Sequence, residues 1–159
     1  MSPRDANPAE LAEIKLMKAS EAIQGAAQEL FKNHGLSAPQ YNVLRILRGA
    51  GPDGLRCQQI ADRMINRVPD ITRLLDRLLE KGLVDRRRSE SDRRVVISVV
   101  TPAGLDHLAR IDGPLEEQVD RNFRALGARE IEALNQLLDR LLSGLGPDVP
   151  SGNEERKQK

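Results

Sequence analysis

Cysteine is nearly absent from this sequence, which contains only Cys57 among its 159 residues. A lone cysteine excludes a disulfide within the chain, and the N-terminus lacks the apolar segment of a secretory signal peptide. We therefore expect a reducing, cytoplasmic location. The longest apolar run, residues 95–100, is far shorter than the ~20 residues that a membrane-spanning helix needs, which favours a soluble protein.

Aromatic residues are also scarce, at 2% of the chain, whereas charged residues reach 31%. The core must therefore be aliphatic, with Leu, Ile, Val and Ala packed along helices. With 159 residues, the chain has the size of one ordinary domain. The composition favours a single, mainly helical domain with short tails.

Charge is nearly balanced over the whole chain, with a net charge of +1, but it is distributed unevenly. Residues 63–94 contain ten Lys and Arg against six Asp and Glu, whereas the other residues contain 15 against 18. A local basic stripe on a mildly acidic body is typical of a surface that meets a polyanion such as DNA.

The spacing of apolar residues predicts six helices with recognisable ends. Asn7, Ser37 and Thr101 are expected N-terminal caps. Pro69 is expected at the first position of the fourth helix, which Gly82 ends. The expected helices cover about residues 8–32, 38–48, 57–64, 69–81, 102–126 and 131–145.

Two β-branched runs after the fourth helix predict a β-hairpin. The runs cover residues 83–88 and 93–100, and the polar "SESD" at residues 89–92 forms the tip between them. Helices followed directly by a hairpin are the order of a winged helix-turn-helix. The predicted fold class is therefore mainly α with a small β-hairpin wing.

The terminal helices carry more apolar surface than a small core needs, so we expect them to form a dimer. The seam of the sixth helix, with apolar residues spaced three and four apart, is similar to a coiled coil. The predicted division is an N-terminal arm and dimerisation helix (1–36), a winged helix-turn-helix DNA-binding core (37–101), C-terminal dimerisation helices (102–146) and a disordered tail (147–159).

The fourth helix is the candidate recognition helix, because its apolar face leaves an outer polar face. Five residues on or beside that face are candidates for contact with DNA: Pro69, Asp70, Thr72, Arg73 and Arg77. Arg73 can bind guanine bidentately and Thr72 can bond a phosphate, whereas Asp70 is anomalous near phosphates. The alternative is that Arg73 and Arg77 are ordinary surface arginines paired with Asp76 and Glu80.

Three motifs in one order carry a family resemblance. The run "TRLLDRLLEKGLVDRR", then "SDRR" at the wing tip and "TPAG" opening the next helix, resembles the MarR family of winged-helix transcription regulators. The resemblance covers nearly residues 8–145. It implies a homodimer on double-stranded DNA, with the fourth helix of each subunit in a major groove and each wing tip in the flanking minor groove.

The resemblance also implies roles for single residues. Arg94 is the expected minor-groove probe, and Asp92 is expected to orient Arg94. Thr72 and Arg73 fall on positions of the recognition helix that often contact DNA. The family usually has Ser and Thr at the start of this helix, where the present sequence has Pro69 and Asp70. The remaining basic residues of the wing are predicted phosphate contacts: Arg86, Arg87, Arg88 and Arg93.

Other candidates are weaker. Cys57, near a helix start and beside Arg56, is a candidate redox switch or simply a small residue at that position. Tyr41 is a candidate for an effector pocket and fits the core equally well. His34 and His107 lack the spacing of metal ligands, and no acid-base pair indicates catalysis, so no metal, cofactor or enzyme activity is predicted.

The predicted function is that of a homodimeric repressor that binds a pseudo-palindromic operator and is released by a small-molecule effector, as the resemblance implies. Two alternatives stay open at this point. One is a thiol-based redox sensor that uses Cys57. The other is a winged-helix module that binds proteins and no nucleic acid, which the basic hairpin disfavours.

Overall fold

A computed structural model describes residues 7–146 of the chain. Within these residues there are six α-helices, a short 3-10 helix and a two-stranded hairpin, which confirms the predicted fold class. The helices are α1 (Pro8–Asn33), α2 (Ala38–Ala50), η1 (Gly51–Asp53), α3 (Cys57–Arg63), α4 (Ile71–Glu80), α5 (Pro102–Phe123) and α6 (Ala128–Gly144). The strands are β1 (Val84–Arg88) and β2 (Val96–Val100). The tail predicted for 147–159 lies outside the described residues.

Side-chain caps begin α1, α2 and α5 at the predicted positions. Asn7 Oδ1 accepts a hydrogen bond from the N–H of Ala9 at 3.1 Å, and Thr101 Oγ1 accepts one from Gly104 at 3.0 Å. Ser37 and Gln40 form a reciprocal capping box, with distances of 3.3 and 3.0 Å. These local hydrogen bonds satisfy N–H groups that have no partner inside the helix.

Four predicted helix boundaries are wrong by two residues or more. α5 ends at Phe123, three residues before the predicted end at 126, and α6 begins at Ala128, three residues before the predicted start at 131. α2 continues to Ala50, two residues beyond the predicted end, because the chain first takes a positive φ at Gly51, where φ is 65°. α4 begins at Ile71 and not at Pro69, because Asp70 is its N-cap and accepts a hydrogen bond from the N–H of Arg73 at 2.9 Å. Pro69 therefore lies before the helix.

The core is aliphatic, as predicted, and centres on α2, which contacts α1, α3, α4 and α5. Its largest fully buried side chains come from four helices and the first strand: Val43, Leu44, Ile46, Leu47, Ile60, Leu75, Leu78, Val84, Leu108 and Ile111. At the edge of this core, Arg48 of α2 forms an ion pair with Asp112 of α5 at 2.8 Å.

The wing is a regular antiparallel hairpin with an additional contact at its base. The strands pair from Val84 with Val100 to Arg88 with Val96. Ser98 of β2 also exchanges two backbone hydrogen bonds with Leu55, at 3.0 and 2.8 Å, in the segment between η1 and α3. This third pairing, which the sequence did not reveal, anchors the wing to the body of the domain.

The end of α4 is joined to the start of α5. Gly82 has a φ of 69°, and the N–H of Leu83 bonds to the carbonyl of Leu78, which completes a Schellman motif. Thr101 then donates its hydroxyl to the carbonyl of Gly82 at 2.7 Å and its N–H to the carbonyl of Leu83 at 3.1 Å. The predicted stop at Gly82 is confirmed.

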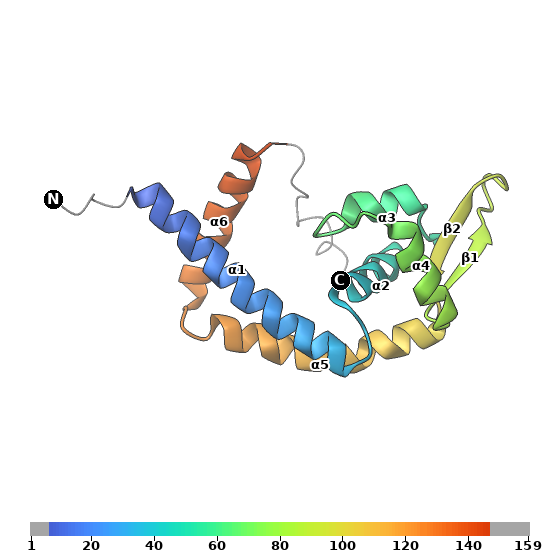
Figure 1. Cartoon of the computed structure of the whole chain (residues 1–159), viewed down its shortest axis with the longest axis horizontal. Helices are drawn as coiled ribbons and strands as arrows, with labels where there is room; N and C mark the ends of the chain where they lie inside the picture. The colour runs from blue at the N-terminus through green and yellow to red at the C-terminus, as the bar shows by residue number, and fades with distance from the viewer. Residues whose placement is uncertain (1–6, 147–159) are drawn as a thin grey trace.

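Figure 1 shows the wing at one end of the molecule and the start of α1, with α6, at the other. α5 runs between the two ends and packs against both α1 and α2. α6 has no buried residue along Ala128–Gly144. Among the described helices, none combines the length and the apolar character that would be needed to cross a membrane.

Candidate nucleic-acid interface

The predicted orientation of α4 is confirmed by burial. Leu74, Leu75 and Leu78 are buried, and Ile71 is partly buried. The side chains predicted to contact DNA are exposed on or just before the helix: Pro69, Asp70, Thr72, Arg73 and Arg77. A short amphipathic helix that is fixed by its apolar side therefore presents hydroxyl and guanidinium groups to the solvent, and these groups can bind base edges and phosphates.

Asp70, anomalous in the sequence, has a structural role. Its Oδ1 accepts the N–H of Arg73, so the carboxylate lies over the N-terminus of α4. A negative charge there is stabilised by the helix dipole and satisfies an otherwise unpartnered donor. Asp70 therefore positions the helix, and its contact with DNA stays a prediction.

The arginines of the wing fall into two groups. Arg87, Arg88, Arg93 and Arg94 are exposed. Arg86 differs, because its side chain is only 32% exposed and its Nη2 lies 2.7 Å from Asp76 Oδ1 of α4. Asp76 thus pairs with the wing, and not with its helix neighbours Arg73 and Arg77 as the surface alternative required.

The wing tip is longer than predicted, because β2 begins at Val96 and residues 89–95 form the turn. The N–H of Ser89 bonds to the carbonyl of Val95, and the N–H of Val95 bonds to the carbonyl of Asp92, both at 2.9 Å. Arg88 donates to the carbonyl of Arg93 at 3.1 Å. Arg93 and Arg94 therefore lie in the turn and not in the strand.

Asp92 acts on Arg94 through the backbone. Its Oδ1 accepts the N–H of Arg94 at 3.0 Å, a local turn that fixes the chain direction at that residue. Within the part of the chain that the structure describes, the guanidinium of Arg94 has no hydrogen-bond or ion-pair partner. The side chain that the resemblance assigns to the minor groove is thus available for an external acceptor.

Cys57 lies at the first position of α3 as a partly buried free thiol. Its Sγ is 3.7 Å from the hydroxyl of Thr72, so the thiol touches the recognition helix. The two histidines have backbone partners: His34 Nδ1 is 2.9 Å from the carbonyl of Leu30, and His107 Nε2 is 2.7 Å from that of His34. Residues 7–146 contain no cluster of three or more metal-binding side chains.

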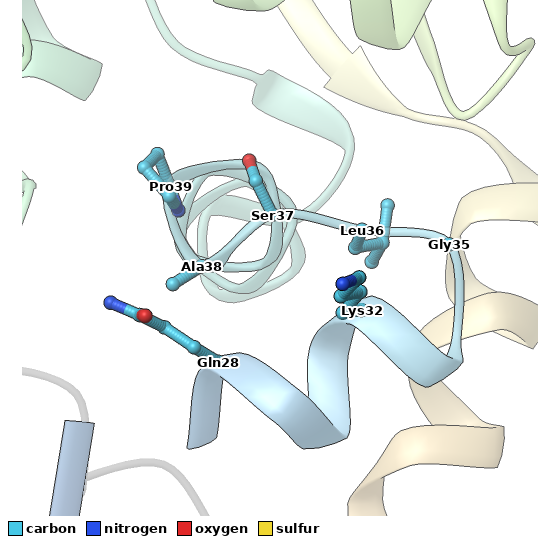
Figure 2. Close-up of a pocket in the computed structure, with 7 residues that line it drawn as sticks. All are labelled: Gln28, Lys32, Gly35, Leu36, Ser37, Ala38 and Pro39. Atoms are coloured by element: carbon cyan, nitrogen blue, oxygen red, sulfur yellow. The ribbon is translucent and has the colours of Figure 1, made fainter. Parts of the chain in front are cut away.

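A pocket lies between the end of α1 and the start of α2 (Figure 2), with a volume of about 540 Å³. Gln28 and Lys32 of α1 lie on one side, and the loop with the start of α2 forms the other. Tyr41 does not line it. Tyr41 is 7% exposed and stacks on Phe31, with ring centroids 4.1 Å apart, so it belongs to the core. Nothing in the sequence distinguished Gln28 or Lys32 from other residues of an amphipathic helix.

An amphipathic helix with exposed hydroxyl and guanidinium groups, beside an arginine-rich hairpin, defines a winged-helix DNA-binding protein. The model of the MarR family matches residues 36–96. The transcriptional regulator MhqR of Bacillus subtilis is 30% identical over 128 residues, which cover 80% of this chain and 87% of MhqR. The chain belongs to the MarR family: it is a DNA-binding transcription regulator and not an enzyme.

Solved structures agree with this assignment. A MarR transcription factor from Planctomyces limnophilus is 38% identical, with a TM-score of 0.64, over 87% of this chain and 99% of that one. A Streptomyces coelicolor family member in complex with DNA has a TM-score of 0.79 at 22% identity, over 94% and 97% of the two chains. The Rhodococcus jostii regulator CouR, bound to p-coumaroyl-CoA, has a TM-score of 0.74 at 24% identity, over 90% and 97%.

Proposed function

We propose that this protein is a cytoplasmic homodimeric repressor that binds a pseudo-palindromic operator. The observation that carries the proposal is the exposed polar face of α4 beside a wing whose turn presents Arg93 and Arg94. α4 enters the major groove, where Thr72, Arg73 and Arg77 reach bases and phosphates. Arg94 enters the flanking minor groove, and Arg87, Arg88 and Arg93 contact phosphates.

Exposed apolar side chains at the far end of the molecule support dimerisation. Ile14 and Met17 of α1 are 45% and 66% exposed, and Leu137 and Leu141 of α6 are 59% and 45% exposed. So much apolar surface on helices that bury little of it within one chain is typical of an obligate interface. Two recognition helices about one helical turn (~34 Å) apart would then meet two half-sites.

The experiment that tests DNA binding is in-vitro selection of duplexes from a random library, followed by mobility-shift titration of the selected duplex. We expect a two-fold symmetric motif and a steep loss of affinity with salt, by about 0.9 in the logarithmic slope for each phosphate neutralised. No enrichment, or binding without salt dependence, would refute the proposal.

Arg94 has a sharper test. Arg94→Ala should lose most affinity on sites with narrow, A·T-rich flanks, because a narrow minor groove has an enhanced negative potential. Arg87→Ala is the matched control, since a phosphate contact should be lost equally on A·T-rich and G·C-rich flanks. If both variants respond alike to the flanks, Arg94 is a phosphate contact and not a probe.

The effector is proposed to be a small molecule that binds the pocket between α1 and α2. CouR shows that a relative of this fold holds such a ligand. The ligand must bind one arrangement of the two recognition helices better than the other, since equal affinity shifts nothing. Gln28→Trp would fill the pocket. Compounds that release DNA from the wild type and also from Gln28→Trp would refute this location.

A redox sensor remains the second candidate, because the thiol of Cys57 touches Thr72 of the recognition helix. Hydrogen peroxide would oxidise the thiol to a sulfenic acid, which adds an oxygen atom to the sulfur at that contact, and would itself be reduced to water. Cys57→Ser should bind the selected duplex like the wild type but should not be released by hydrogen peroxide. Release that is unchanged in Cys57→Ser removes this residue from the mechanism.

A further inference from the structure

The ion pair between Asp76 and Arg86 is difficult to explain by attraction to DNA. Asp76 places a negative charge on the helix that must approach phosphates, and it also occupies one of the arginines of the wing. If electrostatic attraction to DNA were the only factor, a neutral residue at position 76 would give a higher affinity. It would remove the negative charge from α4 and would leave Arg86 available for phosphates. The pair therefore has another use if the surface binds DNA.

The position of Arg86 in the wing indicates that use. In the strand register Arg86 is opposite Ser98, the residue that Leu55 holds on its other side. The backbone of Arg86 thus belongs to the anchored part of the wing, below the turn at residues 89–95. Its side chain reaches from this anchored strand to α4, where Asp76 Oδ1 receives it at 2.7 Å.

Apolar packing joins α4 to the wing, since Leu78 of α4 and Val84 of β1 belong to one buried cluster, and the pair of Asp76 with Arg86 adds a charged contact. Within residues 7–146 this is the only ion pair that joins the two elements. The chain itself connects the two elements through the turn at Lys81–Leu83, where Gly82 has a φ of 69°. The ion pair adds a side-chain connection across that turn, and it restrains the angle between hairpin and helix.

We propose that Asp76 and Arg86 are positioning residues that set the distance between the major-groove and minor-groove contacts, and so the length of the operator half-site. This inference rests on the proposed function, in which α4 and the wing tip bind neighbouring grooves. Arg86 accordingly contributes to affinity through Asp76 and not as a phosphate contact. The helix fixes where the bases are contacted, and the pair fixes how many base pairs away the wing tip enters.

The sign of the effect of Asp76→Ala on affinity tests the proposal. If the surface were governed by charge, Asp76→Ala would remove a repulsive carboxylate, free Arg86 and bind DNA more tightly. A positioning role predicts the reverse, a loss of about two- to fivefold on the selected duplex, since exposed ion pairs have modest coupling. Glu80→Ala is the matched control, because Glu80 is an exposed acid one helical turn further along α4.

The second measurement concerns operator length. One base pair is inserted between the selected half-site core and its flanking A·T-rich tract, and affinities for the two duplexes are compared. Wild type and Glu80→Ala should prefer the original duplex by about fivefold or more, as for other single changes in a site. For Asp76→Ala, the ratio of affinities for the original and the lengthened duplex should be clearly smaller. Asp76→Glu, which keeps the carboxylate, should recover part of this preference for the original duplex.

The outcomes separate the two proposals. A wild type that binds no DNA overturns the proposed function. A wild type that binds, together with an Asp76→Ala that binds as tightly or more tightly and keeps the same length preference, overturns only the positioning role. Circular dichroism establishes that Asp76→Ala is folded, and Asp76→Asn, which keeps the shape of the side chain, replaces it in both measurements if it is not.

Discussion

Gly54 offers a quantitative test of how the wing is attached. Its φ of 62° and ψ of −175° lie in a region that only glycine adopts readily. A Cβ at this position would lie 2.5 Å from the carbonyl oxygen of Ser98 and 2.6 Å from Val99 Cγ1. Ser98 is itself held by Leu55, so neither the segment nor the strand can move aside without breaking the pairing.

Gly51 is a matched control for the backbone. Its φ of 65° and ψ of −151° are similar, but a Cβ there would have no atom within 4 Å. Gly51→Ala should therefore lower the free energy of unfolding by about 1–3 kcal/mol through conformation alone. Gly54→Ala should lower it by about a further 1–3 kcal/mol, the usual effect of forcing atoms into a packed site.

Urea unfolding followed by circular dichroism measures the difference, with the protomer concentration held equal because a dimer's stability depends on it. With a slope of about 1–3 kcal/mol per molar urea, the midpoint of Gly54→Ala should fall below that of Gly51→Ala by about 1 M. Gly54→Ala should also bind the selected duplex less tightly. Equal midpoints for the two variants would show that the close approach at the base of the wing is unimportant.

Three further variants address other parts of the molecule. Leu141→Asp should convert the proposed dimer into monomers in sedimentation velocity, whereas Ser143→Asp on the same helix should not; a dimeric Leu141→Asp would contradict the proposed interface. Ser37→Ala should lower the free energy of unfolding by ~1 kcal/mol through loss of the capping box, and an unchanged urea midpoint would argue against it. Arg48→Ala should lower it by less than ~1 kcal/mol, because the ion pair with Asp112 is partly exposed, and a larger loss would show stronger coupling.

Local signals in the sequence predicted most of the helical framework. The caps at Ser37 and Thr101 depend on residues within four positions, so they can be recognised without knowledge of the fold. The start of α4 was wrong because two local signals compete there: Pro69 is favoured at a first helical position, but the side chain of Asp70 forms the cap. Leu55 was missed because a single bridging residue has no periodicity to detect.

The candidate site was predicted less completely, because long-range pairing decides what each charged side chain does. Arg86 to Arg88 are indistinguishable in sequence, yet only Arg86 is placed by the strand register against Asp76 of another element. The orientation of α4 was predictable from its apolar spacing, whereas the backbone role of Asp92 depends on the conformation of the turn. Contact of these residues with DNA stays a prediction.

The hydrogen bonds from Thr101 to the carbonyls of Gly82 and Leu83 fix the start of α5 to the end of α4, so these two helix ends move together. The 22 residues of α5 span about 33 Å at 1.5 Å per residue. If α5 tilted by about 6° around its C-terminal end, its N-terminal end and the joined end of α4 would move by ~3.4 Å. This distance is the spacing of one base pair along DNA. In the proposed dimer, a small rearrangement where the two subunits meet would therefore be sufficient to move each recognition helix out of register with its half-site.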